Sequence, residues 1–190
     1  MTLAARFENA ISESIELKRL FAAEQGAKVA AAARMLAGTL QGGGKVLLFG
    51  NGGSAADAQH IATELVGHFK IARKPLPALS LTTDTSLLTA LANDDGYETV
   101  FSRQIEGLGD KGDVFLAITT SGNSPSILSA AKTAQQKGIN VIALTGKTGG
   151  KVKNIADLCV KVPSNNTQRI QEAHITIGHI LCLLIEKGLF

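Results

Sequence analysis

The amino-acid sequence predicts a single α/β domain built on a five-stranded parallel sheet, and three observations lead to that class. Short, continuously apolar runs have the pattern of strands buried on both faces, and they span 45–49, 78–81, 114–118, 140–144 and 158–162. Stretches with helical spacing separate these runs, an alternation that predicts right-handed crossovers and helices on both faces of the sheet. The chain has 190 residues, the size of one domain with a substantial core.

The N-terminal segment predicts a pair of helices that precede this alternation. Residues 3–21 carry apolar side chains at helical spacing, namely Leu3, Phe7, Ile11, Ile15 and Phe21. An alanine-rich stretch over 27–40 predicts a second helix, which ends at the glycines 42–44. A stripe this wide is hard to cover within one small domain. We therefore expect residues 1–41 to serve in oligomerisation and residues 45–190 to form the α/β core.

The remaining helices are expected between and after the strands. They fall near 54–69, 85–92, 98–107, 125–137, 149–155 and 167–187. In a parallel sheet the ligand binds beyond the carboxyl ends of the strands. The segments that directly follow the strands are therefore the candidate site: 50–54, 82–84, 119–124 and 145 onward.

Composition excludes several classes of function. The 19 Lys and Arg against 16 Asp and Glu leave a net charge of only +3, and one Tyr and no Trp are available to stack on bases, so we expect no nucleic-acid partner. No apolar segment approaches the roughly 20 residues that a membrane span needs. Cys159 and Cys182 sit in apolar runs and are expected to be buried thiols, which favours a cytoplasmic location.

A glycine-rich loop, Gly50–Ala55, follows the first strand and opens a helix. Glycines let the backbone approach a ligand, and the helix start offers free N–H groups to an anion. The spacing also fits a dinucleotide fingerprint, but no acidic residue ends the second strand, which weakens that reading. A plain glycine turn is the alternative.

A hydroxyl-rich loop, Thr119–Ser124, follows the third strand and precedes Pro125. Capping a helix needs one hydroxyl, whereas this loop has four, at Thr119, Thr120, Ser121 and Ser124. The excess favours a phosphate site that uses hydroxyls and helix N–H groups. Gly146-Lys147-Thr148 looks like the end of a P-loop, but the earlier glycine is missing, so we do not expect a nucleotide there.

Two helices carry pairs of residues with more than one interpretation. His60 and Glu64 lie one turn apart, so they share a face and either bind a metal ion or form an ordinary surface pair. Gln171 and His179 lie two turns apart on the last helix, where a polar residue is more often a satisfied core group. Asn93 and Asp94 suit a polar turn between two helices, with a ligand role as the alternative.

Taken together, these motifs resemble a sugar isomerase (SIS) domain, and in particular the phosphoheptose isomerase family. The resemblance covers almost the whole chain. It rests on GNGGSAADAQH over 50–60, FSRQ over 101–104, TSGNS over 120–124, ALTG over 143–146 and RIQEAH over 169–174. Several separate motifs in the right order are far more specific than one glycine loop.

The resemblance implies a function. It implies conversion of sedoheptulose 7-phosphate to D-glycero-D-manno-heptose 7-phosphate through an enediol, the first step of ADP-heptose biosynthesis for lipopolysaccharide or capsule. It implies a homotetramer with one zinc ion per subunit, and a cytoplasmic enzyme with a sugar-phosphate substrate. Such a reaction needs a carboxylate base, an acid near the oxygens and charge stabilisation.

The same resemblance assigns roles to residues. Glu64 becomes the base and His179 the acid. The implied metal ligands are His60, Glu64, Gln171 and His179. The implied substrate contacts are Asn51, Gly52, Gly53, Glu64, Asn93, Asp94, Thr119, Thr120, Ser121, Ser124 and Gln171. The family commonly has Ser where this chain has Thr119, a change that keeps the hydroxyl.

The main alternative is a non-enzymatic SIS-domain relative, a regulator that binds the replication initiator protein DnaA. The pattern of that regulator replaces the positions equivalent to Glu64 and His179, and both are intact here. A sugar-phosphate sensor usually carries a DNA-binding domain as well, for which 190 residues leave no space. These differences favour the enzyme.

Overall fold

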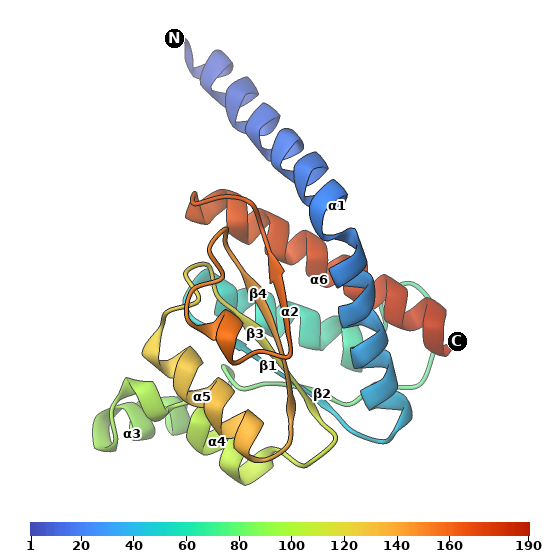
Figure 1. Ribbon diagram of the computed structural model, residues 1–190, viewed down its shortest axis with the longest axis vertical. Helices are drawn as coiled ribbons and strands as arrows, with labels where there is room; N and C mark the ends of the chain where they lie inside the picture. The colour runs from blue at the N-terminus through green and yellow to red at the C-terminus, as the bar shows by residue number, and fades with distance from the viewer.

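A computed structural model, which describes residues 1–190, confirms the predicted α/β class (Figure 1). All neighbouring strands are parallel, and the strand order is β2-β1-β3-β4-β5. The strands are β1 (Val46–Gly50), β2 (Ala78–Ser80), β3 (Val114–Ile118), β4 (Asn140–Thr145) and β5 (Leu158–Lys161). The chain places β2 on one side of β1 and β3 on the other side, so the direction of the connections reverses between β1 and β3. Open parallel sheets bind ligands at such a switch point.

Helices cover both faces of the sheet (Figure 1). They are α1 (Leu3–Gln41), α2 (Gly53–Val66), α3 (Thr85–Asp94), α4 (Ser102–Leu108), α5 (Pro125–Gln136) and α6 (Thr167–Leu189), with short 3-10 turns η1 (Tyr97–Thr99) and η2 (Val152–Asn154). One core cluster lies between the sheet and α1, α2 and α6, and another lies between the sheet and α4 and α5. No helix combines the length and the apolar character that crossing a membrane requires.

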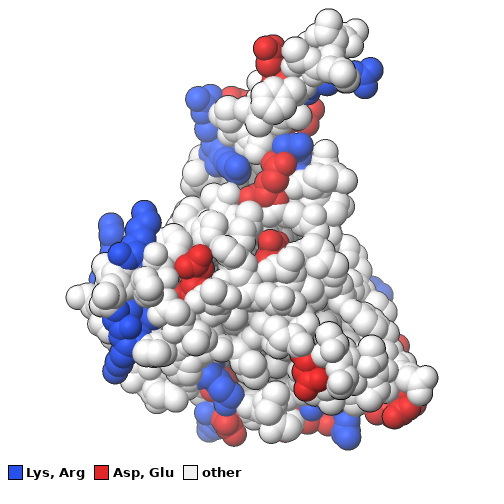
Figure 2. Space-filling view, turned by 180° about the vertical axis from the view of Figure 1, so that it is seen from behind, with Lys and Arg blue, Asp and Glu red and all other residues white.

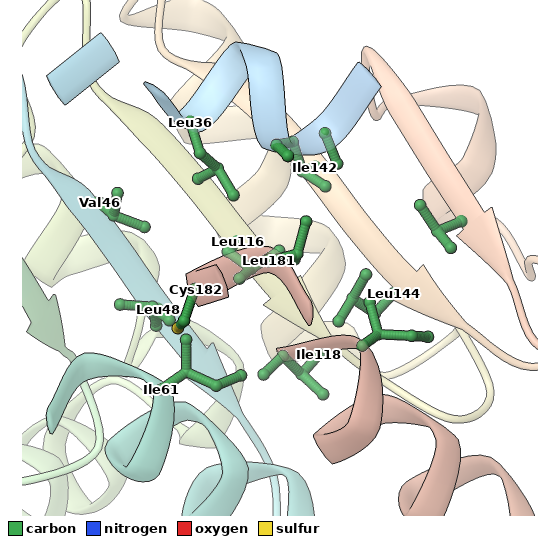
Figure 3. Close-up of a cluster of buried hydrophobic side chains, with 14 of the residues drawn as sticks. Leu36, Val46, Leu48, Ile61, Leu116, Ile118, Ile142, Leu144, Leu181 and Cys182 are labelled. Carbon is green, nitrogen blue, oxygen red and sulfur yellow. The ribbon is translucent and has the colours of Figure 1, made fainter. Parts of the chain in front are cut away.

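The core follows from the alternation of side chains along buried strands. Val46 and Leu48 of β1 point toward α1, α2 and α6, whereas Leu47 and Phe49 point toward the opposite layer. Figure 3 shows the first of these clusters, in which residues of the sheet meet Ile61 of α2 and the α6 residues Leu181 and Cys182. All residues of β1 and β3 are buried, and so are all residues of β4 except Asn140, as continuous apolar runs predict.

The predicted pair of N-terminal helices is wrong, because α1 is one continuous helix of 39 residues. The predicted helices over 3–21 and 27–40 left a gap that contains Gly26, yet a single helical glycine costs only about 1 kcal/mol relative to alanine. The residues before it, Ala22-Ala23-Glu24-Gln25, are good helix formers. The second half of α1 packs against α6, and this packing outweighs the cost of the glycine.

The first half of α1 projects beyond the body of the domain (Figure 1). Its apolar residues Leu3, Phe7, Ile11 and Ile15 are exposed, whereas Phe21, the last member of the predicted stripe, is buried against the domain. From behind, the projecting segment shows uncharged side chains between charged ones, and much of the face beneath it lacks charged residues (Figure 2).

Two further predicted helices are shorter than expected. The helix expected near 149–155 is only the turn η2, because Gly149 and Gly150 adopt φ values of 76° and 54°, outside the helical region. A side chain at Gly150 would also collide with the carbonyl oxygen of Ser121. The helix expected near 98–107 divides into η1 and α4.

Candidate active site

The candidate site lies at the carboxyl edge of the sheet, where α2 and α5 begin after β1 and β3. The turn from β1 into α2 is so tight that a Cβ at Gly50 would lie 2.6 Å from the Ser54 carbonyl oxygen. Gly52 precedes α2 with a φ of 56°, which only glycine adopts readily, and no side chain caps this helix. The N–H groups of Ser54 and Ala55 donate to the carbonyl oxygens of Asn51 and Gly52, so the N–H of Gly53 is the one at the start of α2 that is available to a ligand.

Helices α2 and α6 bring together three residues that the sequence analysis singled out. The Nε2 atoms of His60 and His179 lie 2.9 Å apart, and Glu64 Oε1 lies 3.3 Å from His60 Nε2. One ligand atom from each of the three residues lies within 4.8 Å of the others. The side chains of His60 and Glu64 are 47% and 20% exposed, so the cluster is open to a small molecule.

This donor set fits a catalytic divalent metal ion. Two imidazole nitrogens and one carboxylate oxygen are a ligand set found in catalytic zinc sites, which keep a further position open for water or substrate. The Nε2 atoms of the two histidines face each other. When both rings carry their proton on Nδ1, the two Nε2 lone pairs are free to bind one metal ion between them. An ordinary surface pair of His60 and Glu64 would not explain the third residue, His179, at the same point.

Gln171 lies on α6, two turns nearer the start of the helix than His179. Its amide packs on the glycine loop, and a Cβ at Gly53 would lie 2.7 Å from Gln171 Nε2. Gly53 is therefore needed for close contact between the start of α2 and α6. The structure places Gln171 beside the predicted substrate loop, and its role as a metal ligand stays a prediction.

The hydroxyl-rich loop splits its four hydroxyls between two tasks. Thr119 Oγ1 accepts a hydrogen bond from the Gly122 N–H, and Ser121 Oγ accepts one from the Asn123 N–H, so these two hydroxyls shape the loop. Thr120 and Ser121 line a pocket of about 230 Å³. Ser124 is the N-cap of α5 but makes no capping hydrogen bond, which leaves its hydroxyl free for a ligand.

Lys147 and Thr148 line the same pocket as Thr120 and Ser121, together with Ser164, Asn165 and Thr167. The segment from 145 onward was expected at this edge of the sheet because it directly follows β4, but the incomplete P-loop motif gave Lys147 and Thr148 no expected ligand. The structure adds them to the pocket of the hydroxyl-rich loop. Lys147 adds a positive charge to an otherwise neutral pocket.

Asn51 connects the glycine loop to the start of α5. Its Nδ2 donates to Ser126 Oγ at 3.1 Å, and its Oδ1 accepts from the Tyr97 hydroxyl at 2.9 Å. Asn51, Tyr97 and Ser124 line one hollow. Asn93 and Asp94 end α3 in exposed positions, and their side chains hydrogen-bond to each other at 2.8 Å rather than to another candidate residue.

Asp57 is a titratable residue near the site that the sequence analysis missed. It lies one turn before His60 on α2, and its Oδ2 atom is buried without a hydrogen-bond partner. Burial raises the pKa of the Asp57 carboxyl to about 6, and nearby His60 opposes part of that rise. Asp57 lies within the sequence GNGGSAADAQH over 50–60, but its burial depends on tertiary packing, which the local sequence does not show.

The remaining His and Cys residues lie outside the cluster, and of the two cysteines expected to be buried, Cys182 is buried whereas Cys159 is only partly buried. His174 is fully buried with Nε2 near the Thr145 carbonyl oxygen, and burial lowers its pKa to about 4, so the ring is neutral. His68 is exposed and makes no recorded hydrogen bond. Cys159 and Cys182 are free thiols, and burial raises the pKa of Cys182 to about 12. These residues form no second site with the cluster.

Sequence comparisons identify relatives over nearly the whole chain. Residues 9–146 match the family model described as the SIS domain. The chain is 57% identical over 175 residues to the phosphoheptose isomerase of Aquifex aeolicus, a match that spans 92% of each protein. It is 55% identical over 163 residues to the phosphoheptose isomerase of Geobacter metallireducens, covering 86% of each.

Solved structures agree with the sequence comparisons. The chain resembles a phosphoheptose isomerase from Francisella tularensis with a TM-score of 0.95 and 40% identity, covering 98% of this chain and all of the other. The phosphoheptose isomerase from Neisseria gonorrhoeae gives a TM-score of 0.93 and 43% identity over the same shares. This chain therefore shares its α/β fold with these two proteins over 98% of its length.

Proposed function

This chain belongs to the phosphoheptose isomerase family of SIS-domain proteins, and we propose that the cluster of His60, Glu64 and His179 is its catalytic centre. The chain is an aldose–ketose isomerase that interconverts sedoheptulose 7-phosphate and D-glycero-D-manno-heptose 7-phosphate. The observation that carries the site is the meeting of these three side chains from α2 and α6. All three are residue types that proton transfer and metal binding require.

Glu64 is the proposed base. Isomerisation between an aldose and a ketose moves a proton between adjacent carbons through an enediol, and a carboxylate is suited to carry that proton. One oxygen of Glu64 faces His60, and a carboxylate has a second oxygen to meet the substrate carbon. The side chain is held among other groups yet 20% exposed, so substrate can reach it.

His179 is the proposed acid, which supplies and takes back a proton at the substrate oxygens. Its Nε2 faces the same point as the Glu64 carboxylate, so both proton carriers act on one bound sugar. We propose that His60, Glu64, His179 and Gln171 hold one zinc ion per subunit. When bound there, zinc polarises the carbonyl group of the substrate and favours loss of the neighbouring proton.

The two loops at the start of α2 and α5 are the proposed substrate site. Thr120, Ser121 and Ser124 offer hydroxyls to the phosphate beside the start of α5, and the pocket next to it includes Lys147. Thr119 acts through the loop that its hydroxyl shapes. The proposed sugar contacts are five residues of the glycine loop and of α3, namely Asn51, Gly52, Gly53, Asn93 and Asp94.

The biological setting is also a proposal. We propose that the exposed apolar half of α1 assembles the chain into a homotetramer and that the product enters ADP-heptose synthesis for lipopolysaccharide or capsule. The two free thiols support a cytoplasmic location. The DnaA-binding regulator is not favoured, because the relatives that match at 50–57% identity are phosphoheptose isomerases.

Incubation of the purified protein with sedoheptulose 7-phosphate tests the function. We expect formation of the aldose 7-phosphate, loss of turnover after treatment with a chelator, and recovery when zinc is returned. Sedoheptulose without the phosphate is the matched control and should react poorly. Absence of aldose product from the zinc-loaded protein would contradict the function, whereas turnover that survives complete removal of metal would contradict only the metal site.

A further inference from the structure

A buried ion pair lies just behind the proposed catalytic cluster. Arg73 Nε donates to Glu186 Oε1 at 2.8 Å, and the two side chains are 1% and 3% exposed. Arg73 belongs to the irregular segment between α2 and β2, and Glu186 belongs to the last turns of α6. The pair thus connects that segment to the helix that carries His179.

The guanidinium of Arg73 holds the end of α2. Its Nη2 donates to the Glu64 carbonyl oxygen at 2.8 Å, and its Nη1 donates to the Leu65 carbonyl oxygen at 2.9 Å. The last carbonyls of a helix have no partner within the helix, so a buried helix end needs such donors. Arg73 therefore fixes the backbone of the residue that bears the proposed base.

The carboxylate of Glu186 holds the chain that follows α2. Its two oxygens accept the N–H groups of Phe69 and Lys70 at 2.9 and 3.0 Å. Burial alone would raise the pKa of Glu186, but these two N–H groups and Arg73 outweigh it and hold the pKa below its ordinary value. The carboxylate is therefore charged and makes strong hydrogen bonds.

The held residue Phe69 lies against the proposed acid. Its ring stacks on the imidazole of His179, with centroids 5.7 Å apart and an angle of 18° between the planes. The imidazole ring in turn meets His60 edge-on, with an angle of 75°. A flat neighbour on one face leaves the His179 ring few orientations, so it sets the direction in which Nε2 points.

We propose that Arg73, Glu186 and Phe69 are positioning residues that orient His179 and the Glu64 backbone for isomerisation. This inference rests on the proposed function, because it assigns these residues to the same site. Their contacts are with other residues of the site: the ion pair holds Phe69 and the Glu64 backbone, and Phe69 stacks on the imidazole of His179. The expected signature is a loss of turnover with little change in substrate binding, as for other residues that orient a catalytic or metal-binding histidine.

Phe69 offers the sharper test, because its side chain is partly exposed and its replacement does not leave a buried charge. Phe69→Leu keeps apolar bulk but removes the flat face, and we expect kcat to fall about 10-fold with KM within about 2-fold of wild type. Phe69→Tyr keeps the ring and should retain wild-type kcat. Ile71→Ala, an exposed change in the same segment, is the control for general loosening and should also retain kcat.

Nuclear magnetic resonance of the metal-free protein provides a readout that does not depend on turnover. The chain has 4 His, so the His179 ring protons can be identified by comparison with a His179→Gln variant. In wild type and Phe69→Tyr these protons should show the upfield shift caused by a stacked ring, and in Phe69→Leu that shift should disappear. Wild-type kcat in Phe69→Leu, or an equal loss in Phe69→Tyr, would overturn the inference.

The ion pair is tested through its coupling to Phe69. Arg73→Lys keeps the positive charge, but a single ammonium group cannot replace the planar guanidinium that donates to the Glu64 and Leu65 carbonyl oxygens and to Glu186 at once. We therefore expect this variant to lower kcat. Because Arg73 acts partly through Phe69 and partly through the Glu64 carbonyl oxygen, the double variant should lose more kcat than Phe69→Leu alone but less than the product of the two single losses. Multiplied losses would contradict that path, and if Arg73→Lys does not fold, the comparison of Phe69→Leu with Phe69→Tyr decides. Failure of the proposed function would appear separately, as an inactive wild type.

Discussion

The Nε2 atoms of His60 and His179 lie 2.9 Å apart although 119 residues separate them in the sequence. The contact exists because α2 and α6 approach closely, and Gly178 shows why they can. A Cβ at Gly178 would lie 2.5 Å from Ile61 Cδ1, so the residues next to His179 and His60 pack without a side chain between them. The spacing of two helices therefore determines the geometry of the proposed catalytic cluster.

Gly178→Val should separate these helices. Packing extra methyl groups into a filled core costs about 1–3 kcal/mol, and the displaced α6 should carry His179 away from His60. Chemical denaturation and zinc-binding titration measure the two effects. Gly188→Ala on the same helix is the control, because a Cβ there meets nothing within 4 Å and should keep both properties. Wild-type zinc affinity in Gly178→Val would contradict the link between helix spacing and the cluster.

Ser124→Asp should abolish binding of the substrate phosphate. The hydroxyl of Ser124 makes no capping hydrogen bond, and a carboxylate at this position would repel the anion. Aspartate is also a good N-cap, so the melting temperature should stay near that of wild type. Steady-state kinetics with sedoheptulose 7-phosphate measure the effect, with Ser129→Asp further along α5 as the control. An unchanged KM would refute the phosphate assignment.

His174 should make the protein less stable in weak acid. Burial lowers the pKa of His174 from 6.5 to about 4, so the unfolded chain binds a proton between these pH values that the folded chain does not. Folding stability therefore falls as pH decreases from 6.5 to 4, by about 3 kcal/mol from this residue.

A variant isolates this contribution, because Asp57 works in the opposite direction. The raised pKa of Asp57, about 6, lets the folded protein take up a proton first as pH falls, which increases stability. As the pH falls from 6.5 to 4, the free energy of unfolding of His174→Leu should therefore rise relative to that of wild type. A constant difference across this range, measured by urea denaturation, would show that His174 titrates normally.

Phe7→Glu should weaken assembly. Phe7 is 68% exposed on the projecting half of α1, among other exposed apolar residues, and we expect a second copy of the chain to cover it. Light scattering should find a multimer for wild type at micromolar concentration and a smaller species for the variant. Glu8→Lys, a charged change at the neighbouring position, should keep the wild-type mass. A monomeric wild type would contradict this role of α1.

The sequence predicted the parts of the fold that depend on local pattern. The five apolar runs became strands, and the loops after them meet at one edge because parallel strands share their direction. The pairing of His60 with Glu64 also follows from helical spacing alone. Residues such as Phe69 and Arg73 could not be found this way, because their role depends on contact with α6, more than a hundred residues away.

Errors in the prediction also have physical causes. The helical pair expected over 3–21 and 27–40 is one helix, because the packing of the second half of α1 outweighs the small cost of Gly26 between them. Gly149 and Gly150 had the opposite effect and prevented the helix expected near 149–155. Lys147 was set aside because the P-loop motif is absent, although its place after β4 brings it to the pocket that Thr120 and Ser121 line.

Hydrogen–deuterium exchange at the substrate carbon tests the central assignment most directly, because it follows the proton that Glu64 is proposed to move. Glu64→Gln keeps the size of the side chain and an oxygen atom but removes the base. In deuterated water, wild type should introduce deuterium into the sugar as it turns over. We expect Glu64→Gln to slow both exchange and isomerisation by about 10²–10⁴-fold. Exchange at the wild-type rate in Glu64→Gln would show that the base lies elsewhere and would contradict the account.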